Sequence, residues 1–173
     1  MHNPLKQLFV TGLALMASSA GAEIAPDDCS NPALQPATPS HVFQALGDGS
    51  EVRDTRTGLV WKRCAFGQSW DGSSCSGFPS NRNWAAALAV AVNAGEGWRL
   101  PSVRELQSIV EFCRHDPAIN LQVFPNTFTF DVWTSSPYVG LPGGALVVDF
   151  QNGRSSWSNK GINRSVRLVR GGR

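Results

Sequence analysis

The sequence predicts a single α+β domain in which two helices pack on a small, mostly antiparallel sheet, and disulfides stabilise the domain. Along the chain a hairpin comes first, two helical segments follow, and a group of short strands comes last. This order differs from the strand–helix alternation of a parallel sheet. Hydrophobic residues make up 42% of the 173 residues and charged residues 16%, which favours a packed core over disorder. The four cysteines form an even set that can pair completely.

Residues 1–22 are typical of a signal peptide. Lys6 precedes an apolar run at residues 8–17, and Ala20-Gly21-Ala22 has the small-x-small pattern that signal peptidase accepts. The run is shorter than the ~20 apolar residues that a membrane span needs. No later segment comes close to that length. We therefore expect an exported protein, periplasmic or secreted, with no membrane span.

Residues 23–50 form a predicted Pro-rich lead-in. It contains Pro26, Pro32, Pro36 and Pro39. Because proline fixes φ and lacks the backbone N–H, this segment is expected to be extended and mostly irregular. Residues 42–46 are predicted to form a short first strand within it. The compact body, residues 51–173, is expected to begin near Glu51.

The first part of the body is predicted to form a hairpin followed by a helix. Residues 52–65 combine a β-prone run, Leu59-Val60-Trp61, with turn residues at 54–58. A Gly- and Ser-rich loop follows. Asn83 can cap a helix over residues 84–93, in which five alanines, one leucine and two valines occur without a helix-breaking residue.

A second helix is predicted from a capping box. Ser102 is the expected N-cap, and Glu105 lies three residues later, where its side chain can reach back to the N-cap backbone. This helix is expected to run to about Phe112. Three apolar side chains at i, i+3 and i+4 spacing are expected to face the core: Leu106, Ile109 and Val110.

The last part of the chain is predicted to be a cluster of strands. Residues 131–136 and 145–150 are β-prone runs, and residues 155–158 are expected to pair with the second run. Asn152-Gly153 lies between those two, and this dipeptide is typical of tight hairpins in which both central residues have φ > 0. Residues 165–169 are the last predicted strand.

The cysteines are expected to form disulfides, because the signal peptide indicates an oxidising compartment. Cys64 and Cys75 flank the Gly- and Ser-rich loop and can close it, which leaves Cys29 for Cys113. The second bridge would close a long loop and stabilise the fold by ~4 kcal/mol. A metal site is the alternative, but no CxxC or HxxxH spacing occurs in the sequence.

Several landmarks resemble the Lcl C-terminal domain family, a bacterial family of largely unassigned function named after a collagen-like adhesin of Legionella. The resemblance covers roughly residues 51–173, in the same order. Its landmarks are the run over residues 52–65, Trp98-Arg99-Leu100-Pro101, Glu105-Leu106, Pro117-Ala118-Ile119-Asn120, Phe124-Pro125-Asn126-Thr127, the WTSSPY run at 133–138 and the VRLVRG run at 166–171.

The resemblance implies a C-type lectin-like fold, distantly similar to the formylglycine-generating, sulfatase-modifying enzymes. The activity of those enzymes is not implied, because their redox cysteines lie late in the chain and this sequence has no cysteine after Cys113. The calcium motifs of sugar-binding C-type lectins are absent as well. The comparison with an adhesin implies a glycan or surface polymer as ligand.

The sequence predicts no catalytic residue, no cofactor and no metal. Cys113 lies close to His115, but thiol catalysis needs a free thiolate and Cys113 is expected to be oxidised. Asp149 and Asn152 offer only a weak calcium signal, because such sites need six or more oxygens.

Tryptophans and basic residues are the candidate ligand-binding groups. Trp61, Trp98 and Trp133 lie in the family landmarks and are expected in the core, whereas Trp70 and Trp157 lie in a loop and a hairpin. These last two could pack or could stack on a sugar. Six basic residues and no acid follow Asp149: Arg154, Lys160, Arg164, Arg167, Arg170 and Arg173.

Two interpretations of this basic end remain open. It can pair with the six acids found between Glu23 and Val60, or it can form a basic strip for an acidic glycan. The predicted ligand-binding set is Arg154, Trp157, Lys160, Arg164 and Trp70. A formal net charge of +2 is too small to indicate nucleic-acid binding.

The sequence therefore predicts an exported, non-catalytic binding module, adhesin-like, for a glycan or an anionic surface polymer. The alternative is a structural or protein-partner module of the cell envelope. An enzyme of unknown chemistry is the least favoured interpretation.

Overall fold

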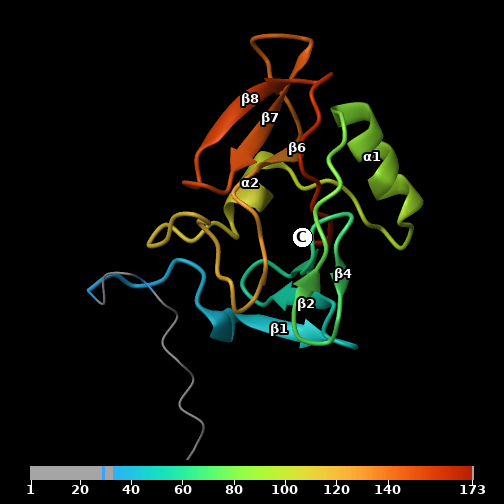
Figure 1. Cartoon of the computed structure of the whole chain (residues 1–173). Helices are drawn as coiled ribbons and strands as arrows, with labels where there is room; N and C mark the ends of the chain where they lie inside the picture. Colours follow the sequence, from blue (N-terminus) through green and yellow to red (C-terminus); the bar gives the residue numbers. More distant parts are fainter. Residues whose placement is uncertain (1–28, 30–32, 173) are drawn as a thin grey trace, which may run out of the picture.

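The computed structural model describes residue 29 and residues 33–172, so the predicted signal peptide lies outside the described residues. Strands come first, two helices lie in the middle of the chain, and strands follow again (Figure 1). The α+β class is thereby confirmed.

No helix in the described residues is long and apolar enough to cross a membrane.

A four-stranded antiparallel sheet joins the two ends of the domain. Its strands, in spatial order, are β1 (Phe43–Leu46), β2 (Glu51–Asp54), β3 (Leu59–Lys62) and β9 (Val169–Gly171). The predicted hairpin is β2–β3. Strand β1 comes from the predicted lead-in, and its pairing with β2 extends the sheet upstream of Glu51. The edge-to-face contact of Phe43 with Phe124, at 5.6 Å between ring centroids, also anchors β1 to the core.

The last strand begins later than predicted. Residues 165–168 are buried, but the regular ladder with β3 starts only at Val169. Ser165 instead forms a parallel bridge with Val132. The segment between Ser165 and Val169 therefore crosses from one sheet to the other, and it cannot stay in the ladder of either.

A three-stranded antiparallel sheet occupies the other side of the molecule, with α2 between the two sheets (Figure 1). It consists of β6 (Asp131–Pro137), β7 (Gly144–Asp149) and β8 (Ser155–Asn159). The predicted β7–β8 hairpin is confirmed. In its turn only Gly153 has a positive φ, +77°, so the prediction of a positive φ at Asn152 is wrong. The turn is longer than two residues, because two hydrogen bonds reach back to Asp149. Gly153 N–H donates to the Asp149 carbonyl, and Asn152 Nδ2 donates to Asp149 Oδ2.

Helix α1 (Trp84–Asn93) has the predicted bounds and cap, with Asn83 Oδ1 accepting from Ala86 N–H at 2.9 Å. Helix α2 (Val103–Gln107) has the predicted capping box, but it ends well before Phe112. After α2 the chain is drawn into a bridge between Val110 and Ile119. That long-range pairing ends the helix.

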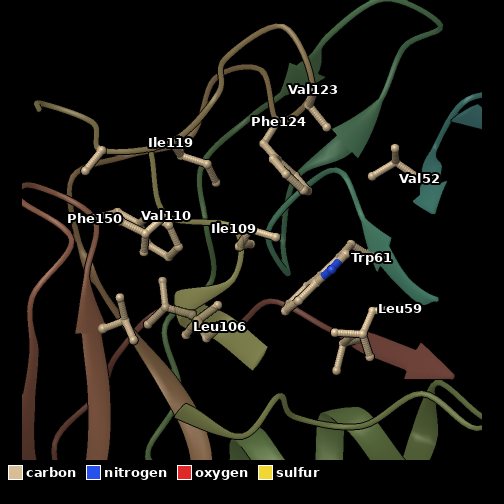
Figure 2. Packing of buried hydrophobic residues seen from close by; sticks show 14 residues of the cluster. Val52, Leu59, Trp61, Leu106, Ile109, Val110, Ile119, Val123, Phe124 and Phe150 are labelled. Carbon is tan, nitrogen blue, oxygen red and sulfur yellow. The ribbon is translucent and has the colours of Figure 1, made fainter. Parts of the chain in front are cut away.

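The core consists of two clusters of buried side chains. Figure 2 shows the first, in which Trp61 of β3 and Leu106 of α2 face Phe124 and Phe150. The second cluster packs α1 on the three-stranded sheet around Trp133. The expected core tryptophans are confirmed, with Trp61, Trp98 and Trp133 at most 5% exposed. Leu106, Ile109 and Val110 are buried as predicted, although only Leu106 is helical.

Both predicted disulfides, Cys29–Cys113 and Cys64–Cys75, are confirmed. The second closes a loop that contains a two-residue hairpin, β4 (Ser69–Trp70) and β5 (Cys75–Ser76). Near the first, the buried carboxylate of Glu111 accepts hydrogen bonds from the backbone N–H groups of Ala37 and Thr38. The lead-in is therefore fastened to the body just before the 3-10 turn at Ser40–Val42.

Candidate functional site

The five predicted ligand-binding residues lie in three separate places. Trp70, in β4, lies beside the four-stranded sheet and far from β8 (Figure 1). Trp157 and Lys160 lie at one end of the three-stranded sheet, and Arg154 and Arg164 lie at the other. The five residues of β8 separate Arg154 from Lys160, a distance of roughly 20 Å along the strand. The predicted basic strip is therefore not continuous.

One end of the three-stranded sheet carries exposed aromatic and apolar side chains. We call it the aromatic end and define it by Tyr138, Val139, Leu141, Trp157 and Lys160. The rings of Tyr138 and Trp157 stack with 5.6 Å between centroids and 6° between planes. Trp157 is 48% exposed, and Val139 is 98% exposed at the β6–β7 tip. Such a cluster is typical of a contact surface rather than of a core.

Lys160 is held in place at this end. Its backbone N–H donates to the carbonyl of Gly143, and its Nζ donates to the carbonyl of Pro142, both at 2.8 Å. The same Nζ lies 4.6 Å from the centroid of the Trp84 ring. An ammonium group has three donors, so this geometry positions the charge while leaving N–H groups for a ligand.

The other end of the sheet contains a polar pocket of about 280 Å³. It lies where β6 begins and β7 ends, because Asp131 and Asp149 are direct partners in the β6–β7 register. The polar pocket is lined by Asn81, Thr129, Phe130, Asp131, Asp149, Asn163, Arg164 and Ser165. Of the predicted set, only Arg164 lines it.

Burial raises the pKa of Asp131, the neighbouring Asp149 raises it further, and Arg164 opposes both effects. Arg164 Nε lies 3.1 Å from Asp131 Oδ2. Asp149 is engaged in its own turn, where Oδ1 accepts from Gln151 N–H and Oδ2 accepts from the Asn152 amide. The pocket thus holds two carboxylates and one guanidinium, a net negative charge.

A cluster of three phenylalanines adjoins the polar pocket. Phe128 and Phe130 stack at 5.6 Å with 12° between planes, and Phe78 lies 5.7 Å from Phe128. Phe78 is 79% exposed and Phe130 is 44% exposed. This cluster was not predicted, although the alternation of Phe128 and Phe130 just before β6 indicates that both rings face one side.

A more apolar pocket of about 320 Å³ adjoins Trp70. The indole N–H of Trp70 donates to the carbonyl of Asp48 at 3.1 Å, and the Arg63 guanidinium lies 4.3 Å from the ring centroid. Phe66 and Leu168 contribute to the lining. Trp70 therefore packs against other side chains, which was one of its two predicted roles, the other being to stack on a sugar.

Residues 50–170 match the family model described as the Lcl C-terminal domain. The match spans well over half of the chain. The chain belongs to the Lcl C-terminal domain family. A search of curated proteins found no match.

Of the described basic residues that follow Asp149 in this Lcl C-terminal domain, Arg164 and Arg170 form ion pairs. Arg170 pairs with Glu51 at 2.7 Å and with Glu96 at 3.1 Å. Glu51 is one of the acids between Glu23 and Val60, so the basic end does pair with an acid from the first part of the chain. Arg164 pairs with Asp131. Arg154 is exposed. The predicted position Arg173 lies outside the described residues.

Arg167 is buried rather than part of a basic surface. Its side chain donates to the backbone carbonyls of Lys62 and Arg63 and to Thr127 Oγ1, and it is 1% exposed. Burial lowers its pKa to about 10. The residue therefore ties the last segment to β3, which is a structural role.

The residues of the domain that were considered for catalysis or metal binding contact other residues of the chain. Cys113 is in a disulfide, and His115 is exposed, with its Nδ1 3.3 Å from Asp116 Oδ2. In the part of the chain that the structure describes, Cys29, Glu111 and Cys113 are the one set close enough to hold a metal. Both sulfurs of that set are bonded to each other, and Glu111 accepts four hydrogen bonds.

Proposed function

We propose that this Lcl C-terminal domain is an exported, non-catalytic binding module that recognises a glycan or surface polymer at its aromatic end. The observation that carries the proposal is the stacked pair of half-buried Tyr138 and half-exposed Trp157, at the end of the sheet where the Pro142 carbonyl also holds the ammonium of Lys160. An aromatic ring offers a flat apolar surface for the C–H face of a sugar. A neighbouring cation suits an acidic or hydroxyl group on the same ligand.

Export is supported by the two disulfides, because such bonds persist in oxidising compartments. A C-type lectin-like arrangement is also part of the proposal. It is supported by the order of the family landmarks, with residues 98–101 leading into α2, residues 133–137 in β6 and residues 169–171 in β9.

The test is binding of the oxidised chain to a panel of neutral, uronic and sulfated glycans. Trp157→Ala is expected to weaken binding up to about tenfold, because the sugar ring loses an aromatic stacking partner and such contacts contribute about 0.5–1.5 kcal/mol. Phe112→Ala is the matched control, since it removes another exposed aromatic ring, 69% exposed, away from the aromatic end.

The contribution of charge is tested by Lys160→Glu. This change is expected to weaken binding of acidic glycans and to reduce the salt dependence that remains, because the ammonium contributes an attraction that salt screens. Arg53→Glu reverses an exposed charge on β2, away from the aromatic end, and serves as control. Equal losses from Lys160→Glu and Arg53→Glu would contradict a local role for Lys160.

A protein-partner module is the second candidate function. It is favoured by the exposed apolar side chains Val139, Leu141 and Ile162, which a protein surface would cover more fully than a sugar ring. No glycan binding at high protein concentration would favour this second candidate over the first.

A further inference from the structure

The polar pocket combines hydrogen-bond donors and acceptors in one small cavity. Acceptors come from the carboxylates of Asp131 and Asp149, and donors come from the guanidinium of Arg164. The amides of Asn81 and Asn163 supply both kinds of group. These side chains are drawn from four separate parts of the chain, so the convergence is a product of the fold.

Part of this hydrogen-bonding capacity is unused within the described residues. The side-chain amides of Asn81 and Asn163 form no hydrogen bond with another described residue, and both residues are exposed at the pocket. Asp131 is bound on one side only, where Oδ2 faces Arg164. A carboxylate can accept about four hydrogen bonds. The pocket can therefore accept and donate several bonds to a ligand.

An apolar surface lies directly beside these polar groups. Phe130 lines the pocket, is 44% exposed and stacks on Phe128 at 5.6 Å. A ligand that fills the pocket would thus meet polar side chains along its edge and an aromatic ring against one face. A sugar ring has this division, with hydroxyl groups at its edge and C–H groups on its face.

The charges in the pocket select among ligand classes. Two carboxylates against one guanidinium would repel a sulfate or uronic acid. An ammonium ion offers donors alone and would leave Arg164 and the amide N–H groups without acceptors. A calcium ion needs six or more oxygens, and here it would lie near the Arg164 charge.

We propose that the polar pocket binds one ring of a neutral, hydroxyl-rich glycan, with Asn163 and Asp131 as hydrogen-bonding residues and Phe130 as the stacking residue. The proposal rests on the proposed function only in taking a glycan as the ligand. It places a second sugar subsite at the opposite end of the three-stranded sheet from Trp157. The two subsites differ in charge, so one glycan chain could meet a cationic surface and an anionic pocket.

The experiment measures calorimetric affinity of the full oxidised chain for neutral oligosaccharides of glucose, mannose and N-acetylglucosamine, with heparin as the sulfated arm. Asn163→Ala and Phe130→Ala are each expected to weaken neutral binding roughly tenfold, since each removes one hydrogen-bonding or stacking partner. Asn93→Ala is the matched control, because it removes an exposed amide at the end of α1. Thermal unfolding of each variant checks that the fold is retained.

Four results would overturn the proposal. The first two are that no neutral oligosaccharide binds at millimolar concentration, or that heparin alone binds. The other two are that Asn163→Ala and Phe130→Ala both leave the affinity for neutral oligosaccharides unchanged, or that a chelator abolishes this binding.

Trp157→Ala separates this proposal from the proposed function. If Trp157→Ala abolishes binding and Asn163→Ala does not, the proposed function stands and the pocket proposal falls. If only the pocket variants lose binding, the pocket proposal stands and the aromatic end is not the site.

Discussion

The two ends of the three-stranded sheet are built in different ways. The aromatic end is local, because its residues lie in the β6–β7 tip at 138–143 and in the nearby run at 157–160. The polar end is assembled from distant segments, which supply Asn81, Asp131, Asp149 and Asn163. The difference teaches that this sheet carries one surface made mostly within the β6–β7–β8 segment and another that needs segments from distant parts of the chain.

The turn at the polar end should tolerate change far less than the tip at the aromatic end. Gly153 has φ of +77°, and a Cβ there would collide with Val110 Cγ1. Gly143 has open space around it and no positive φ. Gly153→Ala is expected to lower the free energy of unfolding by about 3 kcal/mol, through backbone strain and overpacking.

Gly143→Ala should change that free energy by less than about 0.5 kcal/mol, because surface substitutions away from special features have small effects. Urea unfolding of both variants provides the measurement. Similar losses for the two glycines would contradict the contrast between the ends.

A substitution at the aromatic end should weaken ligand binding while changing the free energy of unfolding only a little. Trp157→Ala removes a half-exposed ring and its stacking contact with Tyr138, so we expect a loss of about 1 kcal/mol in the free energy of unfolding. Thermal unfolding measures this loss, to be compared with the larger loss expected for Gly153→Ala. A loss of more than about 3 kcal/mol would place Trp157 in the core rather than on a ligand surface.

The smallest expected effect concerns the charge of Asp131. Because its pKa is raised above the ordinary 3.8, the folded chain binds the proton more tightly than the unfolded chain does. The stability of the wild type relative to Asp131→Asn should therefore fall as pH rises from about 3.8 through the raised pKa. The carboxylate is partly exposed, so solvent screening keeps the change small.

Asp48 provides the opposite case at the four-stranded sheet. Hydrogen bonds from the side chain and backbone of Ser50 lower the pKa of Asp48. Relative to Asp48→Asn, the wild type should therefore gain stability as pH rises from the lowered pKa to about 3.8. Urea unfolding at pH 3 and pH 6 tests both signs, and a shared sign would contradict the assigned environments.

Local sequence signals predicted much of this fold. The Asn83 cap, the box of Ser102 and Glu105, and the Cys64–Cys75 pair each depend on residues close together in the chain. The length of α2 could not be predicted, because residues 110–111 pair with residues 118–119. The burial of Ile109 and Val110 is the same in a helix or in an extended bridge, so periodicity alone could not distinguish them.

The candidate sites were predictable to different extents for the same reason. Trp157 and Lys160 are three residues apart, with Trp157 in the middle of β8 and stacked on Tyr138, and Lys160 directly after the strand. The polar pocket depends on contacts between segments up to about 80 residues apart, as from Asn81 to Asn163. Arg167 was predicted as surface charge because buried arginine is rare, and its position is explained by acceptors distant in sequence, the carbonyls of Lys62 and Arg63 and the hydroxyl of Thr127.

The most direct test of two chemically different sugar surfaces is an NMR titration of the oxidised chain with a neutral and with a sulfated oligosaccharide. Our account predicts that the neutral ligand shifts the side-chain amide signals of Asn81 and Asn163. It predicts that the sulfated ligand shifts the Trp157 indole and the backbone around Lys160. Shifts confined to the Trp70 indole, or no shifts at either end of the three-stranded sheet, would contradict it.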